Sequence, residues 1–322
     1  MARFLKRVLY WLAKLLGLFH LARVATKSRL RILGYHGFQM ADEGAFRPKL
    51  FMSATQLEQR LAWLRKHRFN VIRLDDAIEA LDSASLPPDS VVITIDDGFA
   101  SVHEKALPVF QRFGVPATLY LTTHYFVKEI PVFDLVVSYM FWKTDKEVVD
   151  LSEIGVAPLR EAKSLHLDDK TKDELAETIT NFGETQCDDV GERSIAEKLG
   201  DRLGIPYDDL IRRRSFSLIS RADAERLLAG GVDIQLHTHR HDLPMDARLA
   251  LAEISENRET IYPIQNQPLR HFCYPNGDWS RRHWTPLRSA GIVTATTCTP
   301  GLVDADTPRL ALPRFLDDSR WA

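Results

Sequence analysis

Short apolar runs alternate with segments of helical periodicity from residue 30 to the C-terminus, and this alternation limits the fold to a few architectures. Strand–helix–strand order produces a parallel sheet with helices outside it, either open or closed into a barrel. With 322 residues, 45% of them hydrophobic, the chain can bury the core that such a sheet requires. The predicted strands are residues 30–35, 70–73, 91–95, 117–121, 232–236, 271–274 and 293–297, with 309–313 as a candidate eighth strand.

Two of the intervening segments begin with a capping-box pattern, in which a serine is followed three residues later by Gln or Glu. Ser53 with Gln56 precedes one helix, and Ser101 with Glu104 precedes another that Gly114 would end. Residues 222–229 and 247–261 continue the alternation as helices. The sequence thus predicts an α/β fold.

Residues 133–213 break this rhythm, because they contain almost no strand pattern and many charges. We interpret the segment as a helical insertion above the carboxyl ends of the strands, where the active-site loops of parallel α/β proteins lie. A solvated helical excursion without a role is the alternative. The expected organisation is a basic amphipathic helix over residues 1–29, followed by one domain over 30–322 that carries the insertion.

The N-terminus is strongly basic. Because the whole chain has a formal net charge of −2 and residues 1–31 hold eight Lys/Arg and no acid, the remainder carries −10. Apolar residues recur at helical spacing over residues 4–22, with Tyr10 and Trp11 among them, but Lys14 interrupts the run near its middle. This pattern fits a helix lying on an anionic membrane surface better than one spanning the bilayer. A helix docked on the domain and a secretory signal are the alternatives.

The net charge and the cysteine content indicate which binding partners and which cellular compartment this protein can have. The small net charge argues against a nucleic-acid-binding protein. The three cysteines, Cys187, Cys273 and Cys298, are odd in number and lack C-x-x-C spacing, which argues against a disulfide framework or a thiolate zinc site. Free thiols fit a reducing compartment. We therefore expect a cytoplasmic protein, peripheral at the inner membrane, with an exported, envelope-associated protein as the alternative.

The first residues suited to chemistry lie in segment 91–98, which reads Val-Val-Ile-Thr-Ile-Asp-Asp-Gly. A buried strand that delivers Asp96 and Asp97 at its carboxyl end is typical of an active site. Because side chains alternate along a strand, the two carboxylates should point differently, so one can bind a metal ion while the other faces substrate. An ordinary acidic turn is the alternative, since Asp-Gly is also a strong turn signal.

A second group is formed by His237, His239 and His241, which follow another apolar strand. On a helical turn His237 and His241 would share a face and could bind one cation, whereas in an extended segment all three would share a face. Thr238 stands where an H-E-x-x-H metalloprotease needs Glu, so that mechanism is unsupported. The cluster predicts a metal site.

In this order the motifs resemble those of the polysaccharide deacetylase family, whose members are metal-dependent carbohydrate N-deacetylases. Ile95-Asp96-Asp97-Gly98 is similar to the family's [TS]-[FI]-D-D-G motif, and His237-Thr238-x-x-His241 to its H-[ST]-x-x-H motif. Tyr274-Pro275-Asn276-Gly277 is similar to a variant of its third motif. The resemblance covers roughly residues 30–315. It implies a distorted (β/α) barrel of seven or eight strands.

The resemblance also implies roles for individual residues. Asp97, His237 and His241 would bind a divalent cation, with zinc as the first expectation. Asp96 would be the general base that activates the attacking water. The backbone N–H of Asn276 would help to hold the tetrahedral oxyanion, since the proline before it has no N–H.

Two residues that the family pattern expects are absent at their usual positions, and residues elsewhere in the chain would take over their roles. Cys273 occupies the position where the family often has an arginine that braces the catalytic aspartate, and Arg314 (favoured) or Arg270 would supply that guanidinium. No histidine follows His283, so the family's C-terminal general-acid histidine is absent. Residues 32–37, Ile-Leu-Gly-Tyr-His-Gly, resemble a motif of a circularly permuted subgroup that includes the poly-N-acetylglucosamine deacetylases. That likeness implies that His36 donates a proton to the leaving amine.

The expected function is therefore metal-dependent removal of N-acetyl groups from amino sugars of a cell-envelope polysaccharide or glycolipid. Two alternatives stay open. His237-Thr238-His239 also matches the H-x-H motif of binuclear amidohydrolases, although that family places it on its first barrel strand. The third hypothesis is a non-catalytic glycan-binding module on the same fold.

Overall fold

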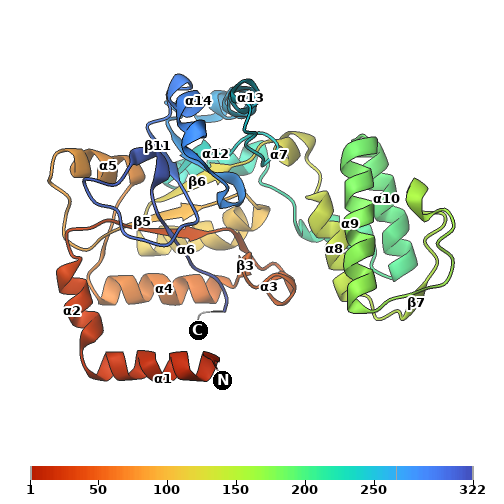
Figure 1. The fold of residues 1–322 in the computed structure, drawn as a ribbon, viewed down its shortest axis with the longest axis horizontal. Coiled ribbons are helices and arrows are strands. Elements are labelled where there is room, and N and C mark those ends of the chain that lie inside the picture. The colour runs from red at the N-terminus through yellow and green to blue at the C-terminus, as the bar shows by residue number, and fades with distance from the viewer. Residues whose placement is uncertain (1, 266, 321–322) are drawn as a thin grey trace.

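The computed structural model describes residues 2–265 and 267–320, without the side chains of residues 2–8, and its centre is a curled parallel sheet surrounded by helices (Figure 1). The strands follow one another in the order β11, β10, β9, β6, β5, β1 and β12, and β4 pairs with the start of β5. These strands are β1 Arg31–Tyr35, β4 Asn70–Val71, β5 Ser90–Ile95, β6 Ala117–Leu121, β9 Val232–Leu236, β10 His271–Cys273, β11 Thr294–Thr296 and β12 Phe315–Leu316.

A single backbone bridge joins the two ends of this sheet. Thr296 of β11 pairs in parallel with Leu312, and the chain continues from there into β12, which pairs with β1. The predicted α/β fold with a curled, barrel-like sheet is confirmed. The predicted strand at 309–313 is wrong, because Arg309–Ala311 form a 3-10 turn between Pro308 and Pro313, and the last strand begins only after Pro313.

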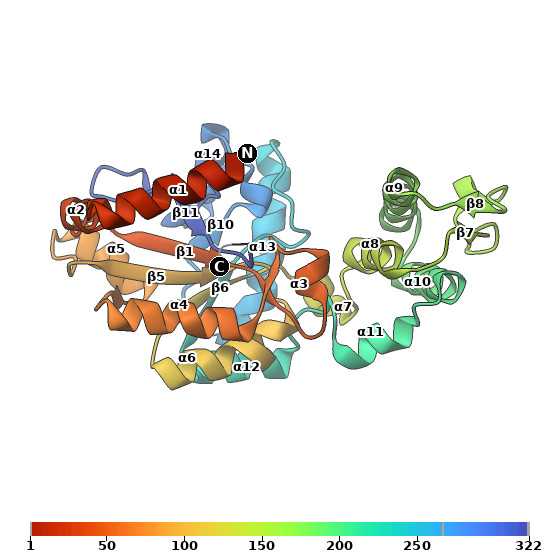
Figure 2. The same cartoon turned by 90° about the horizontal axis from the view of Figure 1, so that it is seen from below.

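Helices cover the outside of the sheet (Figures 1 and 2). They are α4 Ala54–Lys66, α5 Leu74–Asp82, α6 Leu107–Phe113, α12 Arg221–Ala229, α13 Ala247–Gln265 and α14 Trp284–Ser289. The capping box of Ser53 and Gln56 at the start of α4 is confirmed. The capping box predicted for Ser101 is wrong, because its hydroxyl instead accepts the Phe38 N–H at 2.9 Å and a π-helical turn, Val102–Ala106, precedes α6.

The central strands are buried on both faces, which explains their continuous apolar sequence. Every residue of β5 and of β6 is buried. Because these strands offer no exposed position, charged side chains lie beyond their ends. The carboxyl ends of the parallel strands point to one end of the barrel, and this is where the loops with the predicted site residues begin.

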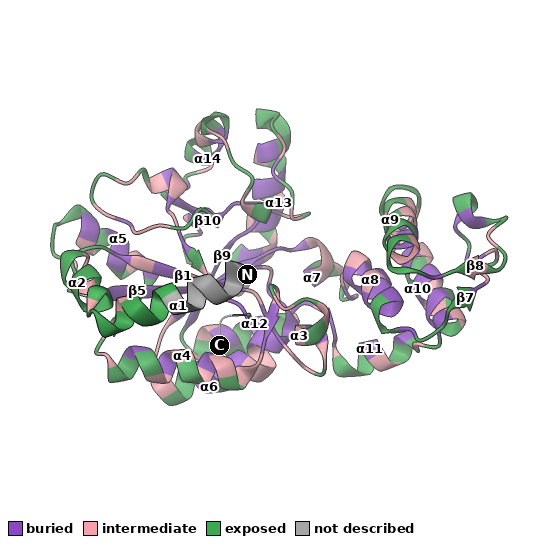
Figure 3. Cartoon of the chain, turned by 60° about the horizontal axis from the view of Figure 1, so that its bottom comes forward, coloured by how far each residue is buried: buried purple, intermediate pink, exposed green. Residues whose placement is uncertain are grey.

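Between β6 and α12, residues 124–213 form a helical arm beside the barrel (Figure 2). The short helix α7 (His124–Lys128) leads into α8 Phe133–Lys143, α9 Asp169–Gln186, α10 Asp189–Leu203 and α11 Tyr207–Arg213. These helices have buried residues of their own, among them Met140, Ile179 and Leu199 (Figure 3). A two-stranded antiparallel ladder, β7 Val148–Val149 with β8 Leu165–His166, was not expected from the sequence, since each strand has only two residues.

Two helices, rather than the one expected, occupy the N-terminus: α1 Ala2–Leu15 and α2 Leu18–Ala25. They are separated at Gly17, which adopts a left-handed conformation with φ +68° that glycine tolerates without a steric penalty. No residue of α2 is buried. No helix in the described part of the chain is long and apolar enough to cross a membrane.

The capping box at α4 gives a test of local stability. Ser53→Ala removes the hydroxyl that accepts the Gln56 N–H at 3.1 Å, so we expect the free energy of unfolding to fall by about 1 kcal/mol. Chemical denaturation measures this change. Ser255→Ala, within α13 and exposed, is the control and should leave stability unchanged or slightly higher. Equal effects of the two substitutions would contradict a capping role.

Candidate active site

All seven predicted site residues lie at one end of the barrel, brought there by five strands. His36 follows β1, the two aspartates follow β5, two histidines follow β9, Asn276 follows β10, and Arg314 directly precedes β12. Parallel strands place their carboxyl ends together, so residues far apart in sequence meet at this edge. Arg270, the alternative guanidinium, lies instead at the start of β10 and pairs with Asp75 at 2.7 Å.

Asp97, His237 and His241 form a tight cluster. Oδ1 of Asp97 lies 3.3 Å from Nε2 of His237 and 3.3 Å from Nε2 of His241. The three ligand atoms lie within 4.8 Å of one another. Two imidazoles and one carboxylate at such spacing can bind one divalent cation and leave further coordination positions open.

The histidine motif adopts a tight turn that matches neither of the two conformations considered for it. Thr238 and His241 both have left-handed backbones, with φ of +63° and +57°. This turn brings His241 back toward His237 and directs His239 away, so that Nδ1 of His239 lies 2.9 Å from the Thr123 hydroxyl. His237 and His239 therefore do not converge as the H-x-H motif of a binuclear site would require.

A second layer of hydrogen bonds orients His237. Its Nδ1 lies 2.9 Å from the carbonyl oxygen of Cys273, which leaves Nε2 directed at Asp97. Asn257 of α13 accepts the His237 backbone N–H at 3.0 Å and donates to the carbonyl of Leu121. Asn257 belongs to no motif; it is a fully buried polar residue on the inward face of α13, beside Glu253, Ile254 and Ile261.

The environment of Asp97 fits a bound cation. Its Oδ1 is buried and has no hydrogen-bond partner among the described residues, although it faces two imidazoles. Burial alone would raise the pKa of Asp97, but the adjacent His237 and His241 hold this pKa well below its ordinary range. The carboxylate is thus ionised, with an oxygen available to an ion.

Asp96, its neighbour, has a different partner. Arg314 donates to both carboxylate oxygens, with Nη1–Oδ1 at 2.8 Å and Nη2–Oδ2 at 2.7 Å. The guanidinium also donates to the Thr94 hydroxyl, the Thr297 carbonyl and the sulfur of Cys273. Both charged groups are almost fully buried. Desolvation would raise the pKa of Asp96, but the attraction and hydrogen bonds of Arg314 keep it below its ordinary value.

His36 also lies next to Asp96. Its Nε2 lies 3.7 Å from Oδ2 of Asp96, and its side chain is partly exposed. Asn276, in the turn after β10, is exposed and has a left-handed backbone at φ +56°. Nearby, the rings of Trp279 and Trp284 stack in parallel with centroids 6.2 Å apart.

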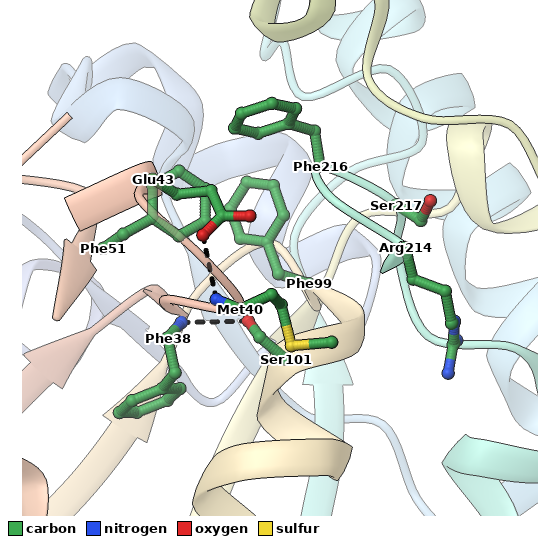
Figure 4. A pocket seen from close by; sticks show the side chains of 9 residues that line it. All are labelled: Phe38, Met40, Glu43, Phe51, Phe99, Ser101, Arg214, Phe216 and Ser217. Atoms are coloured by element: carbon green, nitrogen blue, oxygen red, sulfur yellow. Dashed lines mark hydrogen bonds between the residues drawn. The ribbon is translucent and has the colours of Figure 1, made fainter. Parts of the chain in front are cut away.

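A small cavity lies behind the loops that carry His36 and Asp97 (Figure 4). Phe38 and Phe99, each two residues beyond one of these groups, line it together with Phe216. With about 10 Å³ it has room for roughly one water molecule. The cavity is therefore a feature of packing and not a substrate site.

Comparison with known proteins identifies the family. The polysaccharide deacetylase family model matches residues 83–156 and 204–295, about half of the chain. The protein belongs to the polysaccharide deacetylase family. The unmatched gap falls within the helical arm, and His36 and Arg314 lie outside the matched segments.

Curated relatives cover a shorter part of this deacetylase-family chain. Poly-beta-1,6-N-acetyl-D-glucosamine N-deacetylase of Escherichia coli (strain K12) is 31% identical over 77 residues, which are 24% of this chain and 12% of that protein. The protein of the same name from Staphylococcus aureus (strain N315) is 28% identical over 72 residues, which are 22% of this chain and 25% of that protein.

Solved structures share the fold over nearly the whole chain. Streptococcus pyogenes deacetylase PplD in complex with acetate has a TM-score of 0.59 and 14% identity, covering 91% of this chain and 94% of that one. IcaB from Ammonifex degensii has a TM-score of 0.54 and 17% identity, covering 90% and 91%. At these identities the likeness shows the fold.

The buried pair of Arg314 and Asp96 predicts a large loss of stability on truncation. Arg314→Met leaves Asp96 buried without its partner, so the free energy of unfolding at neutral pH should fall by about 3–5 kcal/mol. Urea denaturation measures the loss. Arg270→Met, which breaks a partly exposed pair with Asp75, is the control and should cost about 1 kcal/mol or less. Similar losses of stability in both variants would show that the buried Arg314–Asp96 pair contributes no more to stability than a partly exposed ion pair does.

Proposed function

We propose that the protein is a metal-dependent hydrolase that removes N-acetyl groups from amino sugars of a polysaccharide or glycolipid. The observation that carries this proposal is the pairing, at one barrel end, of an Asp97–His237–His241 cluster with an arginine-bound Asp96. Membership of the polysaccharide deacetylase family supports the reaction class. The names of the curated relatives support an N-acetylated glucosamine polymer as the substrate class.

Asp97, His237 and His241 would hold the divalent cation, and we propose zinc because two imidazoles and a carboxylate suit it. When bound, the ion polarises the amide carbonyl and increases the acidity of the attacking water. Hydrogen bonding of His237 to the Cys273 carbonyl keeps the correct ring nitrogen directed at the ion.

Asp96 and His36 divide the proton transfers. Asp96 is ionised and held in place by Arg314, so it can take the proton from the attacking water as general base. An amine is a poor leaving group, and His36, whose Nε2 lies 3.7 Å from Asp96, would protonate the departing nitrogen. The exposed backbone N–H of Asn276 would donate to the oxyanion.

The setting of this reaction is also part of the proposal. We place the enzyme in the cytoplasm, peripheral at the inner membrane and acting on cell-envelope glycans, because its N-terminus is basic and apolar and its three cysteines are free. The alternative is an exported, envelope-associated enzyme.

Substitutions in the two aspartates should separate metal binding from catalysis. Asp97→Ala and His241→Ala should lose both bound metal and the release of amine from N-acetylated oligosaccharides, since each removes one of three ligands. Asp96→Asn should keep the metal but lose amine release, because it leaves Asp97, His237 and His241 in place and removes the base, while its side-chain oxygen can still accept from Arg314. Elemental analysis and an assay for free amine measure the two properties.

His239→Gln is the matched control for these variants, because this imidazole lies in the same loop but contacts Thr123. It should retain one metal ion per chain. Full metal content in Asp97→Ala would contradict the ligand assignment, and two metal ions per chain in the unaltered protein would favour a binuclear site. An intact metal site without amine release on any glycan would favour a binding module.

The proposed acid role of His36 can be tested by changing the leaving group. His36→Ala should lower kcat for an N-acetylated sugar by about a hundredfold to ten-thousandfold without changing metal content. An aryl acetate, whose phenolate leaves without protonation, should be hydrolysed at nearly the unaltered rate. If both substrates slow equally, His36 acts in binding or positioning and not as the acid.

A further inference from the structure

The two N-terminal helices present a large apolar surface that the described part of the domain does not cover. Ten large apolar side chains on or between α1 and α2 are between 44% and 70% exposed. They are Leu9, Tyr10, Trp11, Leu12, Leu15, Leu16, Leu18, Phe19, Leu21 and Val24. A monomer in water rarely exposes so many contiguous apolar side chains, which marks the surface as an interaction site.

Within α1 the apolar and basic residues are segregated. At 100° per residue, Leu9 and Leu12 lie close together and Lys14 lies on the opposite side; Leu16, directly after the helix, continues the apolar side, since its N–H donates to the carbonyl of Leu12. The sequence places Arg3, Lys6 and Arg7 on the side of Lys14, although their side chains lie outside the described part of the structure. Such a helix has the pattern of one that lies in the plane of a membrane interface.

Only part of the positive charge at the N-terminus is used within the protein. Arg23 and Arg31 face Asp89, and Arg29 lies 3.8 Å from Asp304. Lys14 and Lys27 have no ion-pair partner among the described residues. These two lysines are therefore available to an anionic partner.

Arg23 fastens α2 to the barrel. Its guanidinium donates to Asp89 at 2.9 Å and to the carbonyl of His67 at 2.7 Å, and it lies 4.4 Å from the centre of the Phe69 ring. The attachment uses one polar side chain of α2, so the apolar residues of this helix remain directed outward. Gly17 then sets the angle between α2 and α1.

We propose that α1 and α2 form a platform that binds in the plane of a membrane rich in anionic lipids. A second copy of the chain is a poorer occupant, because it would bring two sets of cations together without an acid in residues 1–31 to neutralise them. A spanning orientation is also unsuitable, since α1 has 14 residues and α2 has eight. On such a membrane the apolar side chains of α1 would insert among the lipids, and its basic side chains would be attracted to the lipid phosphates. These two interactions together explain why one face of the helix is apolar and the other basic.

Figures 1 and 2 show α2 at the end of the molecule away from the helical arm, and α1 extending from it back in the direction of the arm. The inference deepens the membrane setting of the proposed function and rests on it, whereas the proposed reaction is tested separately by amine release.

Vesicle sedimentation with the full-length protein tests the platform. The protein should bind vesicles of phosphatidylcholine with about one third phosphatidylglycerol more tightly than phosphatidylcholine alone, and less tightly at high salt. Leu12→Glu combined with Leu16→Glu should weaken binding by more than about tenfold. Lys14→Gln should weaken binding about threefold to fivefold, and only to the anionic vesicles.

The control is Val190→Glu, which changes a side chain 75% exposed on α10 in the helical arm and should bind as the unaltered protein does. Thermal unfolding and circular dichroism should be the same for all variants, because none changes a buried residue. Equal vesicle binding by the doubly substituted and unaltered proteins would overturn the proposal. So would a dimer in sedimentation analysis that the leucine substitutions dissociate, since the surface would then bind a second copy.

Discussion

The buried ion pair between Asp96 and Arg314 links the closure of the barrel to the chemistry of its open end. Arg314 lies in the short segment between the Thr296–Leu312 bridge and β12, and its guanidinium bonds groups that follow or end three different strands. Burying two charges costs free energy that only close geometry and complete hydrogen bonding can offset. Because the guanidinium bonds Asp96, Cys273 and Thr297 together, the segment that closes the barrel also holds Asp96 in place.

Two adjacent aspartates acquire different chemistry because their neighbours differ. Asp96 faces a permanent cation that occupies both its oxygens, whereas Asp97 faces two imidazoles and keeps one buried oxygen without a hydrogen bond. Alternation along the strand end points the two side chains apart, and the left-handed backbone of Asp97, at φ +70°, turns it toward the β9 loop. The first carboxylate is thus suited to proton transfer and the second to binding an ion.

The sequence was most informative where chemistry coincides with the end of a buried strand. Asp96, Asp97 and His237 each follow such a strand directly, and the replacement of an expected arginine by Cys273 pointed to Arg314. The turn that pairs His237 with His241 could not be predicted, because it depends on two left-handed non-glycine residues held by tertiary contacts. Asn257 was missed since it acts from a helix 20 residues away, and the break at Gly17 because a single glycine is compatible with a continuous helix.

The attachment of α2 and the candidate active site lie at opposite ends of one strand. Asp89, which binds Arg23, directly precedes β5, and Asp96 directly follows it. All six residues of β5 are buried, and a strand of this length extends about 20 Å. A buried strand between two neighbours is among the most rigid elements of a domain, so the attachment point of α2 and the site are held at a fixed separation. An enzyme bound through α1 and α2 would therefore present its site at a defined height above the surface, and this height limits which part of a membrane-associated glycan can reach Asp96.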